Sequence, residues 1–201
     1  MIDTLASIAA EMRECKACPL WKTARQVVPG EGSGDSGILF LGEAPGFNED
    51  QQGRPFVGAA GQLLDELLAG IGLDRTKVFI TNVVRHRPPE NRDPVPEEIA
   101  ACEAWTVRQV AALAPRVVVT LGRFAMGRFF PGESISRIHG RARVVGGATV
   151  FPMFHPAAAL RSPSLRPAME ADFSALAIFL ATVAAPIPET PRPAEQMTLL
   201  G

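Results

Sequence analysis

Hydrophobic side chains recur along the chain with two spacings, and these predict helices and buried strands. Leu5, Ile8, Ala9 and Met12 follow helical spacing, so we expect an amphipathic helix over residues 3–14. Short runs rich in Val, Ile, Leu and Phe, without polar alternation, are typical of strands buried on both faces of a parallel sheet. Such runs occupy residues 36–41, 77–84, 116–121 and 149–154.

Helical patterns separate and follow these strands. They cover residues 59–71, 95–114 and 123–130, and a last one spans residues 168–183, directly after Pro167. The alternation predicts an α/β domain in which helices cover both faces of a mostly parallel sheet of about four strands. We place this domain at residues 1–185 and expect the Pro-rich tail over residues 186–201 to be disordered.

Composition and charge exclude some classes of function. The 201 residues carry a formal net charge of −1, which argues against a wholly basic coat protein for nucleic acid. Arginine makes up 17 of the 20 cationic residues, so a local basic strip remains compatible with the sequence. The longest apolar stretch, residues 175–185, is far shorter than the roughly 20 residues that span a bilayer. Three cysteines without a basic leader predict a cytoplasmic protein.

Four residues form a candidate set of metal ligands. Cys15 and Cys18 are spaced so that both thiolates reach one metal centre, Cys102 lies in the predicted helix 95–114, and His86 follows the second strand. Three sulfur atoms and one imidazole suffice for four-coordination, and zinc accepts such a set as well. The alternative is that the cysteines are incidental or core thiols and that His86 is a loop residue.

The remaining unusual residues gather in loops after the strands, the edge at which parallel sheets bind ligands. Gly42-Glu43-Ala44-Pro45-Gly46-Phe47-Asn48-Glu49-Asp50 follows the first strand, and Gly53-Arg54-Pro55-Phe56-Val57-Gly58 comes shortly after it. Asn82 ends the second strand and His155 ends the fourth. Each feature alone has a structural explanation, such as a solvated acidic turn or a core phenylalanine.

Together these segments resemble the uracil-DNA glycosylase superfamily, specifically its family-four branch of iron–sulfur enzymes. The motifs at residues 42–46, 53–58, 81–84 and 155–160 occur in the family's order and spacing, and the resemblance runs from about residue 9 to about residue 183. It implies a three-layer α/β/α sandwich around a four-stranded, mostly parallel sheet. It also implies a [4Fe-4S] cluster and, as a step of DNA repair, hydrolytic excision of uracil that leaves an abasic site.

The resemblance implies a pocket for a uracil base flipped out of DNA. Phe56 would stack on the base and Asn82 would read its Watson–Crick edge, recovering interactions that the base loses on leaving the helix. Glu49 would lie against C5 of uracil and exclude the methyl group of thymine. Gly42 and Ala44 would complete the substrate-binding residues.

Two residues are implied as catalytic. Cleavage of the glycosidic bond leaves positive charge on the sugar and negative charge on uracil O2. His155 would donate a hydrogen bond to that oxygen. Glu43 would orient water and stabilise the sugar cation.

Further residues are expected to contact DNA. Leu160 would enter the duplex as a wedge while Arg161 grips phosphate, and Arg137 and Arg141 would also contact phosphate. Some relatives bond covalently to the abasic sugar through a histidine in an Arg-Arg-Ile-His loop, and Arg137-Ile138-His139 looks similar. In those relatives the loop is an insertion before the last cysteine, and the stretch between His86 and Cys102 holds no such insertion.

The chain departs from the family at one cluster ligand, because His86 stands where a third of four cysteines is expected. We therefore expect a [4Fe-4S] cluster held by Cys15, Cys18, His86 and Cys102, with zinc, a three-iron form or a labile cluster as alternatives. The cluster would hold the N-terminal helix to the DNA-binding loop, so its role is expected to be structural.

The expected partner is uracil-containing DNA, bound by a monomer. Residues 196–200, Gln-Met-Thr-Leu-Leu, resemble the short peptide by which bacterial proteins enter the sliding clamp; the alternative is a frayed terminus. The alternative function is a uracil-DNA-binding protein that binds or covalently traps the damaged site without turnover.

Overall fold

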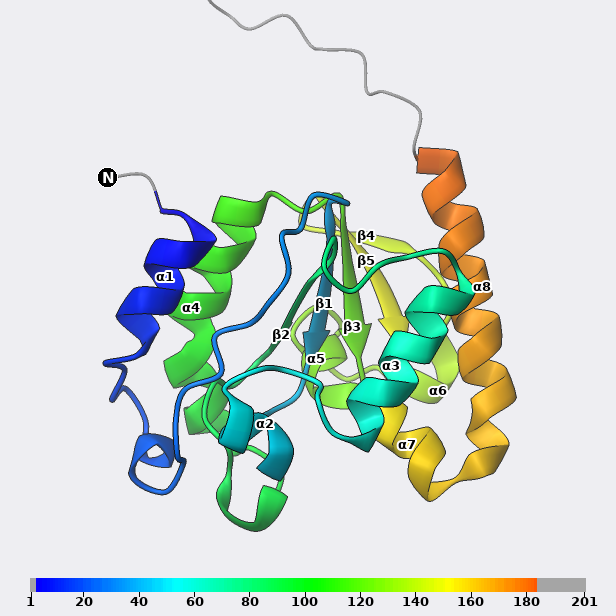
Figure 1. The fold of residues 1–201 in the computed structure, drawn as a ribbon. Helices are drawn as coiled ribbons and strands as arrows, with labels where there is room; N and C mark the ends of the chain where they lie inside the picture. Colours follow the sequence, from blue (N-terminus) through cyan, green and yellow to red (C-terminus); the bar gives the residue numbers. More distant parts are fainter. Residues whose placement is uncertain (1–2, 184–201) are drawn as a thin grey trace, which may run out of the picture.

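Five strands form the central sheet in a computed structural model that describes residues 3–183 (Figure 1). In chain order they are β1 (Ile38–Gly42), β2 (Phe79–Asn82), β3 (Val117–Leu121), β4 (Arg143–Val145) and β5 (Ala148–Met153). The order across the sheet is β2-β1-β3-β5-β4, and β1, β2, β3 and β5 run parallel. The four predicted strands are therefore confirmed as a parallel set.

The expected strand count of four is wrong, because β4 adds an antiparallel fifth strand at the edge. It has only three residues, and Arg143 and Val144 are exposed, so it lacks the buried apolar run that marks the other strands. Its turn to β5 is Gly146-Gly147, with φ of 56° and 83°. A two-residue turn with positive φ at both positions is typical of a β-hairpin, and such turns favour glycine. The Gly-Gly pair in the sequence could therefore have indicated the β4–β5 hairpin.

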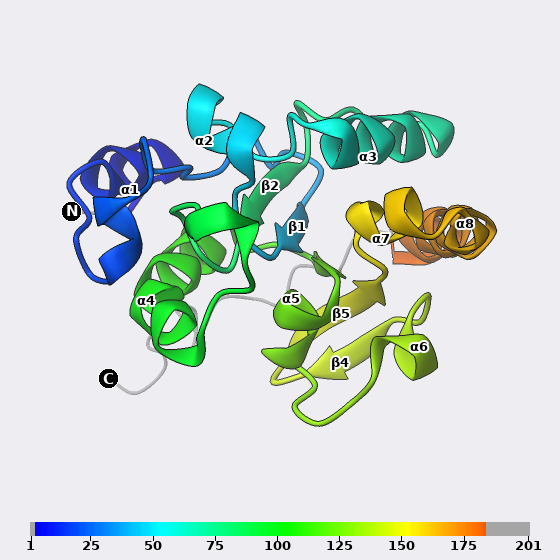
Figure 2. The same ribbon diagram turned by 90° about the horizontal axis from the view of Figure 1, so that it is seen from below.

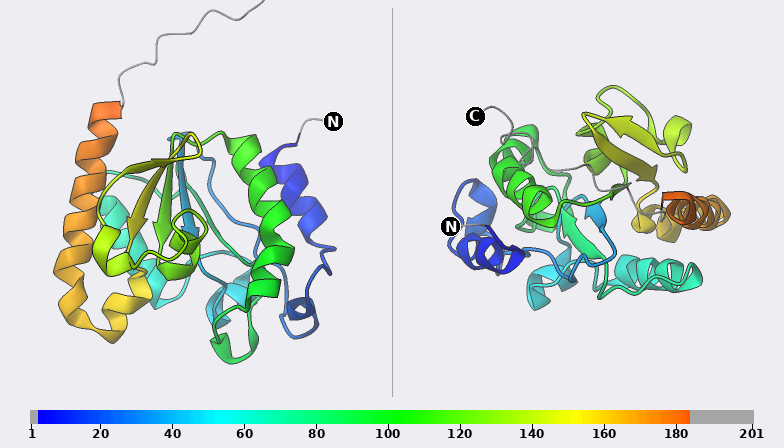
Figure 3. Two further views of the ribbon diagram at one scale, coloured as in Figure 1. Left: turned by 180° about the vertical axis from the view of Figure 1, so that it is seen from behind. Right: turned by 90° about the horizontal axis from the view of Figure 1, so that it is seen from above.

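Helices cover both faces of the sheet, as the alternation predicted (Figure 2). α3 (Ala59–Gly70) and α8 (Arg166–Val183) pack on one face through a core that includes Phe40, Leu64 and Phe173. α4 (Pro96–Leu113) and α5 (Arg123–Gly127) cover the other face. α1 (Leu5–Met12) lies outside α4, where Ile8 and Met12 are fully buried (Figure 3).

Short helices surround the carboxyl ends of the parallel strands. α2 (Phe47–Gln52) follows β1, a 3-10 turn (Pro89–Asn91) lies in the loop after β2, and α7 (Pro156–Arg161) follows β5 (Figure 1). The other short helices are α6 (Ile135–Ile138) and two 3-10 turns, Pro19–Lys22 and Pro163–Leu165. None of these was predicted, because elements of three to six residues are too short to show helical periodicity.

The tail lies outside the described residues, and so does the peptide at residues 196–200. Within residues 3–183, none of the helices combines the length and apolarity needed to cross a membrane.

Candidate active site

The parallel register places two predicted site residues side by side. Gly42 at the end of β1 is the register partner of Asn82 at the end of β2. His155 lies two residues beyond the end of β5 and begins α7 as its N-cap. The site therefore forms where parallel strands end, which is the edge that the sequence predicted.

Phe56 packs directly against this pair. A Cβ atom on Gly42 would lie 2.4 Å from Asn82 Oδ1 and 2.6 Å from Phe56 Cζ, so only glycine allows this approach. Asn82 is 1% exposed, and its Oδ1 atom has no hydrogen-bond partner. An unpaired buried acceptor is costly unless a ligand pairs with it, so Asn82 is suited to recognise a donor group.

His155 also packs against Phe56. The ring centroids are 5.4 Å apart with an interplanar angle of 27°. Burial lowers the pKa of His155 to about 4, and the positive charge of Arg161 acts in the same direction. Nδ1 accepts a hydrogen bond from the Ala157 backbone N–H at 3.1 Å, which assigns the proton of the neutral ring to Nε2. The ring is thus a neutral donor at Nε2.

Glu43 faces a cleft of about 330 Å³. Residues from several loops line it: Ala44, Asn91, Asp93, Gly122, Arg123, Ile135, Phe154, His155, Ala157, Ala158 and Arg161. Burial raises the pKa of the Glu43 carboxyl, Asp93 raises it further, and Arg123 and Arg161 oppose the shift. The structure thus brings the two predicted catalytic residues, Glu43 and His155, to one cleft.

Sequence reasoning missed the polar rim of this cleft. Asp93 and Arg123 form an ion pair there, and Arg123 follows Gly122 directly after β3. The available signal was position, because the loop after the third strand belongs to the same edge of the sheet as the other site loops.

Glu49 connects two site loops through hydrogen bonds to their backbone N–H groups. Its Oε1 accepts the backbone N–H groups of Val57 and Gly58 at 2.9 Å each, and its Oε2 accepts that of Gly46 at 3.1 Å. The carboxylate therefore fixes the loop that carries Phe56. Its expected position against C5 of uracil stays a prediction.

The predicted DNA contacts occupy two places. Arg161 lines the cleft, and Leu160, 49% exposed, precedes it on α7. Arg137 on α6 and Arg141 before β4 are exposed but do not line the cleft. Of the four residues, Arg161 alone lines the cleft, and Leu160 is its exposed neighbour on α7.

His139 is held in a contact of its own. Its Nδ1 lies 2.9 Å from both carboxylate oxygens of Asp172, and its ring is 4.4 Å from that of Phe154. His139 is not among the residues that line the cleft. The contacts with Asp172 and Phe154 give His139 a structural role.

The three cysteines are free thiols on one side of the molecule. Cys18 and Cys102 pack in one buried cluster, and Cys15 Sγ accepts a hydrogen bond from Trp105 Nε1 at 3.2 Å. Burial raises the pKa values of the Cys18 and Cys102 thiols, and the charge of Cys15 acts in the same direction on both. The protein thus gathers all three predicted sulfur ligands.

His86 is the fourth predicted ligand. It is buried, its pKa is lowered by burial, and Asp50 opposes that shift. Between residues 3 and 183, no three His, Cys, Asp or Glu side chains adopt an arrangement that would hold a metal ion. The assignment of His86 as fourth ligand therefore stays a prediction.

Arg85 adds a buried cation beside the thiols. Its Nη2 donates to Thr106 Oγ1 at 3.1 Å and to Gln109 Oε1 at 2.7 Å, while Nε and Nη1 are buried without partners. Burial lowers the pKa of Arg85 to about 10, and the interaction with Cys102 is the main opposing influence. A buried cation with free donors needs a nearby negative group. Soft thiolates that carry negative charge onto an iron–sulfur or zinc centre fit this environment.

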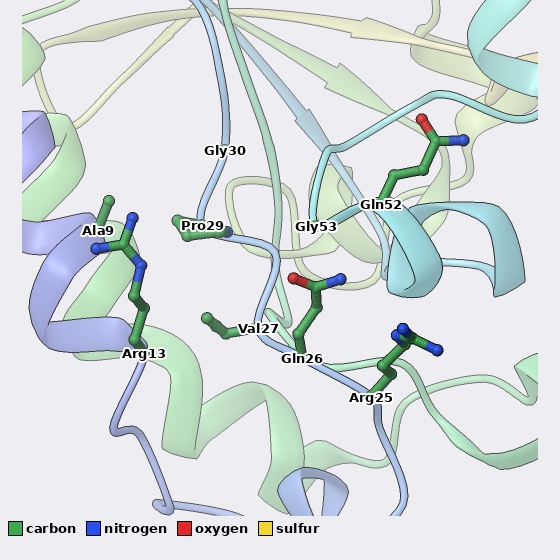
Figure 4. Close-up of a pocket in the computed structure, with 9 residues that line it drawn as sticks. All are labelled: Ala9, Arg13, Arg25, Gln26, Val27, Pro29, Gly30, Gln52 and Gly53. Carbon is green, nitrogen blue, oxygen red and sulfur yellow. The ribbon is translucent and has the colours of Figure 1, made fainter.

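A second hollow, of about 490 Å³, lies between α1, the segment 25–30 and the end of α2 (Figure 4). Arg13 is the C-cap of α1, and Arg25 and Gln26 come from the segment before β1. None of the predicted site residues lines it, so size alone does not locate the active site.

Comparison with known proteins agrees with this geometry. The model of the uracil DNA glycosylase superfamily matches residues 29–178. The chain is 48% identical over 182 residues to a type-4 uracil-DNA glycosylase of Sulfurisphaera tokodaii, covering 86% of this chain and 83% of the relative. Type-4 uracil-DNA glycosylases of Saccharolobus solfataricus and Archaeoglobus fulgidus are each 46% identical, over 86% of this chain and 84% and 91% of their own lengths.

The matched region contains the five strands described above and both catalytic candidates. The chain belongs to the uracil-DNA glycosylase superfamily.

Proposed function

We propose that this protein is a DNA-repair glycosylase that flips uracil out of DNA and hydrolyses its N-glycosidic bond. The observation that carries the proposal is the buried, unpaired Asn82 Oδ1 beside Phe56. Uracil presents an N3–H donor and an O4 acceptor, and an amide complements both. Cytosine presents an acceptor at N3, which Asn82 Oδ1 would repel.

Phe56 supplies the stacking surface for the flipped base. A base leaving the helix loses stacking and pairing worth roughly a few kcal/mol, and a snug aromatic pocket restores part of that free energy. Gly42 allows the ring to lie against Asn82, and Ala44 borders the neighbouring cleft. Glu49, which holds this loop, lies against uracil C5 in the proposed complex.

His155 and Glu43 divide the chemistry. The neutral His155 ring donates from Nε2 to uracil O2 as negative charge develops there, an interaction worth about 3 kcal/mol or more in a dry site. Glu43, as a carboxylate, orients the attacking water and stabilises positive charge on the sugar. Arg123 and Arg161 favour its charged form.

DNA is held at the rim of the cleft. Leu160 enters the stack as an apolar wedge and Arg161 binds phosphate beside it. Arg137 and Arg141 contact phosphate farther along the duplex.

We infer that Cys15, Cys18, Cys102 and His86 hold a [4Fe-4S] cluster. The neighbouring thiols and the unpaired donors of Arg85 support an anionic sulfur-ligated centre, and because His86 replaces a cysteine, zinc, a three-iron form or a labile cluster is the alternative. The cluster supplies structural cross-linking between the N-terminal segment and α4. Iron, sulfide and zinc analysis of anaerobically purified protein, with absorbance at about 400 nm, distinguishes these centres.

The function is tested with a labelled oligonucleotide that carries one uracil. Wild type and His155→Ala are compared after alkali treatment and on a denaturing protein gel. Alkali-labile product over many turnovers, reduced steeply in the variant, supports the glycosylase. A shifted protein–DNA band without product supports covalent trapping. If neither product nor a shifted band appears, a binding protein without turnover is supported.

Two further proposals concern the whole chain. The protein acts as a cytoplasmic monomer, which size-exclusion chromatography with light scattering tests for oligomeric state. Residues 196–200 bind the sliding clamp, so deleting residues 195–201 abolishes capture by the clamp and leaves excision intact. Undiminished capture would end the clamp proposal.

A further inference from the structure

Phe56 adopts an unusual backbone conformation. Its φ is 52°, in the left-handed region that bulky residues rarely occupy. The strain of such a conformation is of order 1–3 kcal/mol and persists only when the surroundings enforce it. The loop between α2 and α3 therefore needs contacts that hold Phe56 in place.

Arg75, in the segment between α3 and β2, provides contacts on one side of this loop. Its Nη1 donates to the Phe56 carbonyl at 2.9 Å, and its Nη2 donates to the Pro55 carbonyl. Nη1 also bonds Asp65 Oδ1 at 2.8 Å, and Nε bonds Glu31 Oε1 at 2.6 Å. The guanidinium is thus fixed by two carboxylates while it grips two successive carbonyl groups.

The opposite edge of the same loop is held by Glu49, which accepts the backbone N–H groups of Val57 and Gly58. Helix α3 closes the remaining side, because a Cβ atom on Gly61 would lie 1.8 Å from the Phe56 carbonyl oxygen. Arg75 donates to the loop's carbonyl groups and Glu49 accepts from its amide groups, so the loop has little freedom to relax.

We propose that Arg75 is a positioning residue that sets the Phe56 ring for the flipped base. The Phe56 ring lies close to both Asn82 and His155, so a change of its φ would shift the ring relative to both. Arg75 itself is absent from the cleft that contains Glu43 and His155. The inference rests on the proposed stacking role of Phe56 and names the residue that enforces it.

The test separates base stacking from general DNA binding. Affinity is measured for one oligonucleotide with a non-cleavable 2′-fluoro-2′-deoxyuridine and for a second with a tetrahydrofuran abasic analogue. Arg75→Met should weaken binding to the uracil probe about tenfold or more, the scale of one lost base stack, and leave binding to the abasic probe unchanged. Equal losses for both probes would overturn the proposal.

A double-mutant cycle with Phe56→Ala supplies the second readout. If Arg75 acts through the ring, Arg75→Met should cause no further loss of uracil-probe affinity in the Phe56→Ala background. Additive losses would contradict the proposal. If Phe56→Ala alone leaves affinity unchanged, the proposed stacking role fails instead, so the two failures are distinguishable.

The chain offers a matched control in Arg116. This arginine also donates to backbone carbonyls, of Ser36 at 2.9 Å and Val183 at 3.5 Å, but at the amino end of β3, far from the site. Arg116→Met should leave binding to both probes unchanged. Should Arg75→Met fail to fold, Arg75→Lys replaces it; a single ammonium cannot span the contacts of the guanidinium fork, so the same selective loss is expected.

Discussion

At the scale of single residues, the site depends on close packing of side chains around Gly42 and on the lowered pKa of His155. Gly42 lets Phe56 and Asn82 meet, and burial keeps His155 neutral. In the proposed reaction, the first effect serves recognition of the base and the second serves its departure, so substitutions should separate them.

Gly42→Ala should impair recognition while the fold survives. The added methyl group overlaps Phe56 and Asn82, so the ring must move, and misplacement by about 1 Å typically costs about a hundredfold in rate. We expect kcat/KM for uracil excision to fall by about that factor, with a stability loss of about 1–3 kcal/mol from overpacking. Unaltered kinetics would show that the ring does not need this position. Gly70→Ala, where a Cβ atom would meet nothing within 4 Å, is the control.

The pH dependence should report Glu43 and not His155. Glu43 acts as a carboxylate and its pKa is raised by burial, so kcat/KM should decline as pH falls through a value above the ordinary 4.5. His155 has a pKa of about 4, so no inflection should appear near its ordinary value of 6.5. Single-turnover rates between pH 4 and 9 measure both features. An inflection near 6.5 that disappears in His155→Ala would contradict the assignment.

At the scale of elements, two short helices carry or adjoin several of the proposed site residues. α2 carries Glu49, which fixes the loop of Phe56. His155 is the N-cap of α7, which ends with Leu160 and Arg161. In the proposed complex, one short helix therefore links the residues that open the stack to the residue that meets uracil O2.

Leu160→Ala should separate duplex from single-stranded substrate. The wedge is needed only where a stack must be opened, so excision from a duplex should fall about tenfold while excision from a single strand changes little. Competition between labelled duplex and single-stranded oligonucleotides measures the ratio. Val144→Ala, at an exposed valine on β4, serves as control. Equal losses on both substrates would mean that Leu160 contacts DNA without opening it.

At the scale of the whole molecule, the region of the three cysteines connects the N-terminal segment to α4. α1 packs on α4, and the Cys18–Cys102 cluster continues that contact toward the loop after β2. A centre bound here would therefore contribute chiefly to stability, because it closes a long loop of the chain.

His86→Cys and His86→Ala test that arrangement. If His86 is the fourth ligand, the alanine variant should lose iron and melt at a lower temperature, and the cysteine variant should retain its cluster longer in air because thiolate restores the family's ligand set. Iron content, absorbance decay and thermal melting are the measurements. Unchanged iron content in His86→Ala would show that His86 is not a ligand.

Much of this protein was determined by local sequence. Buried apolar runs and helical periods predicted the parallel strands and long helices, since burial on both faces demands those patterns. The edge position of Gly42, Glu43, Asn82 and His155 followed as well, because parallel strands end at a common edge.

Only the tertiary structure decided the contacts between segments distant in sequence. The grip of Arg75 on the Phe56 loop joins positions 19 residues apart, the three amide bonds of Glu49 depend on how two loops fold back, and the unpaired donors of Arg85 appear only once α4 covers them. The three-residue β4 lacked a buried pattern and formed because β5 offered an open edge. Periodicity records which face of an element is buried, whereas the conformation of a loop depends on the partners that the rest of the fold brings to it.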